Sequence, residues 1–140
     1  MKRASHFSDL LSVDDLTALH RQAVSWHGGG GTGAKDLDCI QGSLGNAWTA
    51  EGYEEEEAKV PGLAFAGYAL FYLARNHCFS DGNKRAAWLA AMAILGRLDL
   101  TVTVSVEEGL ALVTNVITGA VPQARDVVEW LADRLEPHPR

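Results

Sequence analysis

The segment from His77 to Arg85, near the middle of the chain, holds a potential base, a potential metal ligand and two cations. Histidine exchanges protons readily near neutral pH, so His77 could act as a general base toward a Ser, Thr or Tyr hydroxyl. Asp81 offers the hard oxygen atoms that Mg²⁺ prefers, because magnesium sites often combine one or two carboxylates with phosphate oxygens and water. Such a set suits phosphoryl or nucleotidyl transfer, which depends on positioning and on charge stabilisation.

The residues that follow Asp81 are those expected of an anion hole. Gly82 permits a positive φ that would turn backbone N–H groups toward an anion, and Asn83 adds a neutral amide donor. Lys84 would act as a point charge, and Arg85 could hold phosphate oxygens with two parallel hydrogen bonds. A helix that begins here would add its unpaired N–H groups and the positive end of its dipole.

Two neighbouring residues complete the candidate site. Phe79, an apolar residue among polar ones, is predicted to anchor the loop in the core rather than to contact substrate. Arg75 could be a further phosphate ligand, although a solvated arginine at a helix end is an open alternative. A plain turn between helices would explain Asp81 and Gly82, but not the crowding of His, Asn, Lys and Arg, so a functional site is favoured.

Two long apolar segments must position this loop. Pro61 begins one predicted helix, which runs to about Asn76, and a second is predicted from Lys84 to Leu98. Both segments are apolar on nearly all sides, which is typical of central helices in a bundle. They are therefore expected to be neighbours in the core, joined at a common end by the loop.

Four further helices are predicted around this pair, so the fold class is all-α, a compact six-helix bundle. Leu100 to Val106 alternates apolar and polar residues, but a lone strand has no partner, so it is predicted to be an extended connector or a short edge element. Trp48 to Lys59 has no apolar period and is predicted to be an exposed loop. The predicted limits of the four helices are Ser12 to Gly28, Asp36 to Trp48, Ser105 to Gly119, and Pro122 to Pro137.

Three other features resemble functional sites but have plainer interpretations. His20 lies on or beside the apolar face of the first helix, so a packed histidine is favoured over a catalytic one. The glycine run from Gly28 to Gly31 lacks the Gly-Lys-Ser/Thr ending of a phosphate-binding loop, so it is expected to be a hinge or a tight connection between helices. Glu54 to Glu57 are expected to be solvated rather than to bind a cation.

The composition predicts a single cytoplasmic domain that spans residues 1–140. A hydrophobic content of 47% is enough to build a single core. The net charge of −6 and the pI of about 5.2 oppose a nucleic-acid-binding surface, and no apolar segment reaches membrane-spanning length. Cys39 and Cys78 lack the spacing of a metal site and are expected to be reduced thiols, with a disulfide as the less favoured alternative.

The pattern His-x-Phe-x-Asp-Gly-Asn-Lys-Arg at positions 77–85 resembles the active-site motif of the Fic/Doc family, in its Doc branch. The resemblance covers most of the chain and implies the Fic/Doc bundle, with the active-site loop between two central helices. The other segments that resemble this branch, in the same order, are Ala18 to His20, the glycine run, Gly33 to Leu37, Leu73 to Asn76 and the region of Gly119.

The resemblance also implies a reaction. Fic-type AMP transferases usually carry Gly where this chain has Lys84 and a second Arg where it has Trp88, whereas Doc-type proteins carry Lys and an apolar residue. Doc-type proteins resemble kinases that bind ATP in a flipped orientation. The implied activity is thus that of a Ser/Thr protein kinase, which uses ATP and Mg²⁺ to phosphorylate a translation factor similar to elongation factor Tu and so halts translation.

The partners implied are those of a toxin–antitoxin system, with a small Phd-like antitoxin that neutralises the toxin. Val104 stands where self-restrained Fic proteins carry the Ser or Thr of an inhibitory motif, ahead of Glu108 and Gly109, so inhibition in trans is expected. In Fic/Doc-like proteins the connection that corresponds to residues 48–59 lies over the active site. This implies that Tyr53 and the glutamates after it help to dock the target.

Three departures from the Doc pattern keep other functions open. Cys78 stands where proline is common, Ala86 where threonine is common, and Leu89 where a polar residue can assist the phosphates. A catalytically weakened module that binds a nucleotide or a partner is one alternative. A Fic-type AMP transferase is the other.

Overall fold

The chain folds into six helices and one two-stranded sheet over residues 6–26, 37–54, 60–79 and 82–138, the parts that this computed structural model describes. The predicted all-α bundle is confirmed. The elements are η1 (Phe7–Asp9, a 3₁₀ turn), α1 (Val13–Trp26), α2 (Leu37–Glu54), α3 (Leu63–Asn76), α4 (Asn83–Arg97), β1 (Leu100–Val102), α5 (Val106–Thr118), α6 (Ala124–Ala132) and β2 (Leu135–Pro137).

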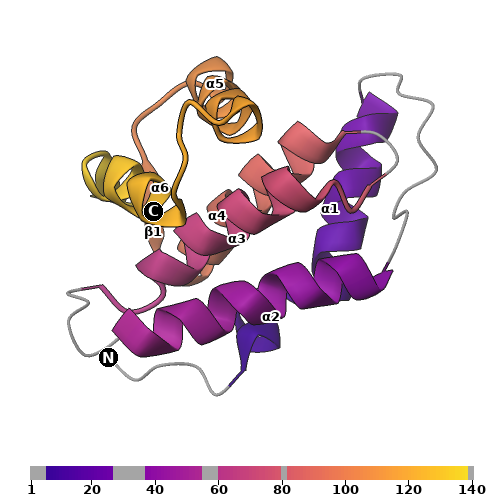
Figure 1. Ribbon diagram of the computed structural model, residues 1–140, viewed down its shortest axis with the longest axis horizontal. Helices are drawn as coiled ribbons and strands as arrows, with labels where there is room; N and C mark the ends of the chain where they lie inside the picture. The colour runs from indigo at the N-terminus through magenta and orange to yellow at the C-terminus, as the bar shows by residue number, and fades with distance from the viewer. Residues whose placement is uncertain (1–5, 27–36, 55–59, 80–81, 139–140) are drawn as a thin grey trace.

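Helices α3 and α4 lie side by side through the middle of the molecule (Figure 1). Every side chain from Ala64 to Leu70 is buried, because α3 is covered by α2 on one side, by α5 and α6 on the other, and by α4 along its length. Alanines on α4 let the two helices pack together. The chain passes from α3 to α4 through residues 77–82, the motif loop, beside α1 (Figure 1).

Of the two predicted capping boxes, the one at Ser12 forms with both of its hydrogen bonds, and at Ser105 the side-chain cap forms. Asp15 N–H donates to Ser12 Oγ at 3.0 Å, and Ser12 N–H donates to Asp15 Oδ2 at 3.2 Å, which fixes the first turn of α1. At α5, Glu108 N–H donates to Ser105 Oγ at 3.2 Å. Local sequence therefore determines where these helices begin.

The end of the chain differs from the sequence prediction. The last helix was expected to carry Leu135 on its inner face, but α6 ends at Ala132 and residues 135–137 form β2. This strand pairs antiparallel with β1, with Thr101 opposite Glu136. The residue before a proline disfavours helical backbone, so Glu136 next to Pro137 suits a strand, and β1 gains a partner that local sequence did not reveal.

Helix α2 is longer than predicted, and α3 begins slightly later. The segment after Trp48 was expected to be a loop, but α2 continues to Glu54. The edge of the Trp48 indole meets the Phe65 ring at 5.3 Å between centroids, so packing on α3 supports this helix where the sequence lacks an apolar period. Pro61 lies just before α3, whose N-cap is Gly62. The predictions for the glycine run and for Glu55–Glu57 lie outside the described residues.

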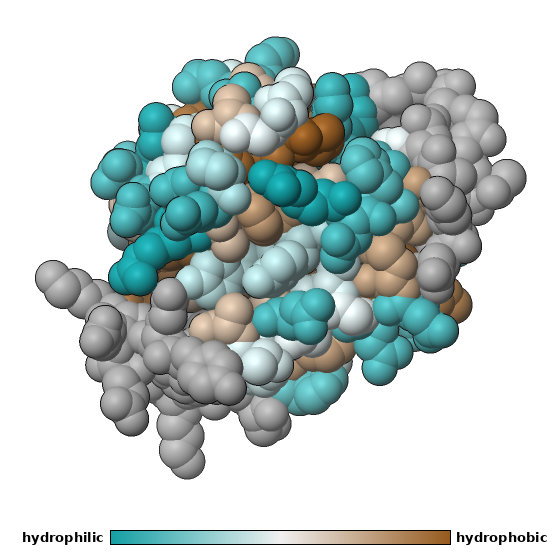
Figure 2. All heavy atoms as spheres, viewed as in Figure 1, coloured by the Kyte–Doolittle hydropathy of each residue, from teal (hydrophilic) through white to brown (hydrophobic). Residues whose placement is uncertain are grey.

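The face of the molecule drawn in Figure 2 mixes polar and apolar residues. Figure 2 shows hydrophilic residues over most of the described surface on one face, with hydrophobic residues in separate small patches. Within the described ranges, every helix is too short or too polar to cross a lipid bilayer.

Helices α3 and α6 approach each other closely at Gly67. A Cβ atom at this position would lie 2.5 Å from Val128 Cγ2 and 3.0 Å from Val128 Cα. The second of these atoms is backbone and cannot rotate away. Glycine therefore sets the distance between the two helices.

Replacing Gly67 with alanine is expected to lower the free energy of unfolding by about 1–3 kcal/mol, the usual cost of overfilling a packed core. Gly42→Ala is the matched control, because nothing lies within 4 Å of an added Cβ there. That change should raise stability by about 0.5–1 kcal/mol, since alanine favours a helix more than glycine does. Urea unfolding measures both values, and a Gly67→Ala protein as stable as wild type would contradict the close approach.

Candidate functional site

The motif loop begins and ends with residues in the left-handed backbone region. His77, the C-cap of α3, has φ 50° and ψ 56°, and Gly82, the N-cap of α4, has φ 72° and ψ 26°. The positive φ expected at Gly82 is present. A histidine adopts this region at some energetic cost, which the surrounding structure must offset. The result is that the exposed His77 side chain stands at the end of α3, at the entrance to the loop.

Phe79 fixes the loop to α1. Its side chain is 2% exposed, and its ring stacks on that of His20, with 4.0 Å between centroids and 25° between planes. His20 is fully buried, as expected for a packed histidine. No local pattern indicates this stacked pair, because the two residues lie far apart along the chain.

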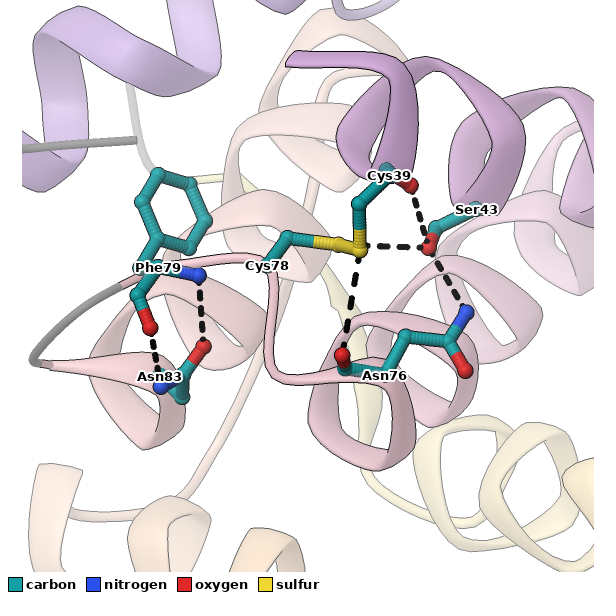
Figure 3. The surroundings of a disulfide bond; sticks show 6 residues. All are labelled: Cys39, Ser43, Asn76, Cys78, Phe79 and Asn83. Carbon is teal, nitrogen blue, oxygen red and sulfur yellow. Dashed lines mark hydrogen bonds between the residues drawn. A yellow bond between two sulfur atoms is a disulfide. The ribbon is translucent and has the colours of Figure 1, made fainter. Parts of the chain in front are cut away.

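Asn83 fixes the loop to α4. Phe79 N–H donates to Asn83 Oδ1 at 3.0 Å, and Asn83 Nδ2 donates to the Phe79 carbonyl at 2.8 Å (Figure 3). The amide side chain thus pairs with both backbone groups of one loop residue. Phosphate binding by Asn83 stays a prediction, and what the structure adds is a positioning role that the sequence analysis did not foresee.

The first turn of α4 carries the two predicted phosphate-binding cations. Lys84 is exposed and Arg85 is partly exposed. Ala86 N–H donates to the Gly82 carbonyl at 2.9 Å, so the N–H groups of the three preceding residues have no acceptor within the helix. A helix start with cationic side chains favours an anion, and the structure brings this start to the same loop as His77.

Arg75 lies at the end of α3 but contacts α5. Its Nε donates to the Val116 carbonyl at 3.0 Å, and its Cζ lies 4.9 Å from the centroid of the Phe71 ring. A cation near the last carbonyls of α5 complements that end of the helix dipole. Phosphate binding by Arg75 stays a prediction, and it would have to use the remaining N–H groups of the guanidinium.

The predicted magnesium ligand, Asp81, lies outside the described residues. Elsewhere in the described chain, no three His, Cys, Asp or Glu side chains converge as a metal site would require. Mg²⁺ sites nevertheless often combine one carboxylate, as Asp81 would supply, with nucleotide phosphates and water.

Cys39 and Cys78 form a disulfide, so the expectation of two reduced thiols is wrong (Figure 3). The physical reason is tertiary: α2 packs along α3, and this packing brings the first turn of α2 to the motif loop. Ser43 and Asn76 surround the sulfur atoms. Ser43 Oγ accepts from Asn76 Nδ2 at 2.8 Å and donates to the Cys39 carbonyl at 2.8 Å.

Trp88, one turn into α4, belongs to the core. It is 6% exposed, and its ring meets that of Trp130 edge to face, with 6.3 Å between centroids. A Cβ atom at Gly109 of α5 would lie 2.5 Å from the Trp88 ring, so this glycine makes room for the indole. The side chain at position 88 therefore joins α4 to α5 and α6 rather than lining the loop.

The two hydrogen bonds between the Asn83 side chain and the backbone of Phe79, here called the clamp, can be tested by mutation. Asn83→Ala removes the partners of two backbone groups beside a buried residue and is expected to cost about 1–3 kcal/mol of stability, with faster amide exchange at Phe79. Asn83→Asp should also be destabilising, because it keeps the acceptor for the Phe79 N–H but places a carboxylate oxygen against the Phe79 carbonyl oxygen. Asn46→Ala, on the exposed side of α2, is the control. Thermal unfolding and hydrogen exchange measure the effects, and equal exchange at Phe79 in Asn83→Ala and wild type would exclude the clamp.

The comparison with protein families agrees with this geometry. The sequence model of the Fic/DOC family matches residues 10–95, a stretch that includes the whole motif loop and most of the helices around it. Among curated proteins, no relative matches the chain. Because the family match covers more than half of the sequence, the chain belongs to the Fic/DOC family.

Proposed function

We propose that this protein is a Doc-like Ser/Thr kinase that transfers the γ-phosphate of ATP to a translation factor similar to elongation factor Tu. The observation that carries the proposal is the arrangement of His77, Lys84 and Arg85 at two helix ends that one short loop joins. Membership of the Fic/DOC family supports a transferase. A base on one helix end and an anion hole on the next are the parts that phosphoryl transfer needs.

In the proposed reaction, the hydroxyl oxygen of the target residue attacks the γ-phosphorus of ATP. Its proton passes to an imidazole nitrogen of His77, and the bond from the γ-phosphorus to the bridging oxygen breaks to release ADP. Lys84, Arg85 and the first N–H groups of α4 would stabilise the negative charge on the phosphate oxygens. Phe79 and Asn83 act indirectly, by fixing the loop between the base and the anion hole.

Mg²⁺ is part of the proposal, with Asp81 as the residue that would hold it. Bound there, the ion would neutralise charge on the nucleotide phosphates. The steps above are carried by side chains and backbone groups of the chain itself.

The surroundings of Trp88 support phosphoryl transfer over AMP transfer. Fic-type AMP transferases usually place a second arginine at this position, where it serves the nucleotide. Here the side chain is 6% exposed and packs against Gly109 and Trp130. A charged side chain at this place would lose its solvation inside the core, so α4 is built to work without it.

A catalytically weakened module that binds a nucleotide or a partner is the second candidate function. The observation that favours it is that two of the predicted phosphate ligands have other hydrogen bonds. Asn83 is paired with Phe79, and Arg75 with the Val116 carbonyl. Slow growth on expression that persists in His77→Ala would support this candidate, because binding alone needs no base.

The proposal includes a cytoplasmic setting and a Phd-like antitoxin that restrains the toxin in trans. The surroundings of α5 support control by a separate chain. Glu108, the glutamate that an internal inhibitory motif would use, accepts a hydrogen bond from the Ser105 hydroxyl at 3.3 Å. Val104 packs against the core and offers no hydroxyl.

The test of the kinase uses ATP labelled at the α or the γ phosphate, with Mg²⁺ and elongation factor Tu as target. Label is expected from the γ position alone, and His77→Ala should lower the rate by about 10²–10⁴-fold, the usual contribution of a general base. His138→Ala, another exposed histidine, is the control and should keep the wild-type rate.

Nucleotide binding by His77→Ala should survive, since the anion hole remains intact. Transfer from the α position would instead favour the AMP transferase. Unchanged transfer by His77→Ala would exclude its role as base, and no transfer to the factor or to a bacterial lysate would favour the binding module.

A further inference from the structure

We infer that Cys39 and Cys78 are a reversible redox pair that orders the motif loop, so that oxidation raises and reduction lowers the rate of transfer at His77. The effect on rate rests on the proposed function. The effect on loop order rests on the disulfide alone. The inference thus adds a form of control to the site.

The disulfide joins two parts of the molecule that otherwise meet by packing. Cys78 directly follows His77 in the motif loop, whereas Cys39 lies 39 residues earlier, in the first turn of α2. The neighbouring Phe79 is held to α1 by its stack on His20 and to α4 by Asn83. The loop is therefore attached to three helices, and its attachment to α2 is the covalent one.

The surroundings of the sulfur atoms suit the reduced state as well as the oxidised one. Cys39 Sγ lies 3.7 Å from the Asn76 carbonyl, and Cys78 Sγ lies 3.6 Å from Ser43 Oγ (Figure 3). Reduction requires the two sulfur atoms to move apart from their bonded distance, and each thiol then has an oxygen acceptor close by. Reduction therefore removes the covalent bond without leaving a buried thiol beside apolar groups only.

The two sulfur atoms differ in access. Cys78 is 1% exposed, whereas Cys39 is partly exposed, so an external thiolate reaches the Cys39 sulfur first. Attack there by a low-molecular-weight thiol such as glutathione breaks the protein disulfide, forms a mixed disulfide at Cys39, and releases Cys78 as a thiolate that takes up a proton.

A second thiolate then attacks the external sulfur of the mixed disulfide. This step releases the oxidised low-molecular-weight disulfide and leaves Cys39 as a thiolate, which is also protonated. In total, one protein disulfide and two thiols give two protein thiols and one external disulfide. Oxidation runs the same exchange in reverse, with the low-molecular-weight disulfide as oxidant.

The pair has the properties expected of a sensor. In the cytoplasm proposed for this protein, thiols are kept reduced, and disulfides that form there are usually transient and respond to oxidants. The residue beside Cys78 is the proposed base, whose backbone at φ 50° depends on its surroundings. Loss of the bond to α2 would let His77 leave the position needed for transfer, which is sensitive to small displacements.

The test uses the full chain as wild type and as Cys39→Ser, each equilibrated in glutathione buffers from reducing to oxidising. Mass spectrometry of alkylated thiols measures the disulfide, hydrogen exchange measures the amides of residues 76–79, and γ-labelled ATP measures transfer. Ser8→Ala is the control variant, an exposed position in the 3₁₀ turn η1, outside the motif loop, where the hydroxyl lies 2.9 Å from His6 Nδ1. Reduced wild type provides the same comparison should Cys39→Ser fold poorly.

Oxidised wild type is expected to show several-fold slower exchange at residues 76–79 and several-fold faster transfer than reduced wild type. Cys39→Ser should match the reduced protein in every buffer, and Ser8→Ala should respond as wild type does. Equal exchange in oxidised and reduced wild type would overturn the inference, as would a redox response that persists in Cys39→Ser. Slower amide exchange in the oxidised protein without any phosphate transfer would contradict the proposed kinase and still support the ordering of the loop. Phosphate transfer at the same rate in the oxidised and reduced proteins would refute the control of rate.

Discussion

The burial of α3 and α4 against each other is the constraint on which the rest of the structure depends. Neither helix has a polar face, so each must be covered on nearly all sides, and the other helices supply that cover. Where the covering helices approach this pair closely, glycine makes room, at Gly67 of α3 against α6 and at Gly109 of α5 against Trp88 of α4. Because the pair cannot shift without opening the core, the distance between the end of α3 and the start of α4 is fixed.

The motif loop spans that fixed distance and is held by further contacts of its own. Phe79 is stacked on His20 from α1 and clamped by Asn83 from α4, and Cys78 is bonded to α2. These contacts surround His77 without using its side chain. The proposed base must be held in place and still reach its substrate, and attaching the residues beside it would achieve both.

Several polar residues around the loop have structural partners, and this changes how a family motif should be interpreted. Asn83 pairs with backbone groups, and Arg75 supports the end of α5. The residues left to meet an anion are Lys84, Arg85 and the first N–H groups of α4. The proposed anion hole is thus concentrated at one helix start, where a terminal phosphate would be held close to His77.

The sequence by itself determined the helices, the central pair, the N-terminal caps at Ser12 and Ser105, and the position of the motif loop, because capping and apolar periodicity are local properties. Tertiary structure decided the features that join distant segments: the disulfide, the stack on His20, the pairing of β1 with β2, and the extension of α2 to Glu54. Each of these depends on a partner that only the fold brings near. The partner lies far away in the sequence, so a pattern of residues within one segment could not predict the contact.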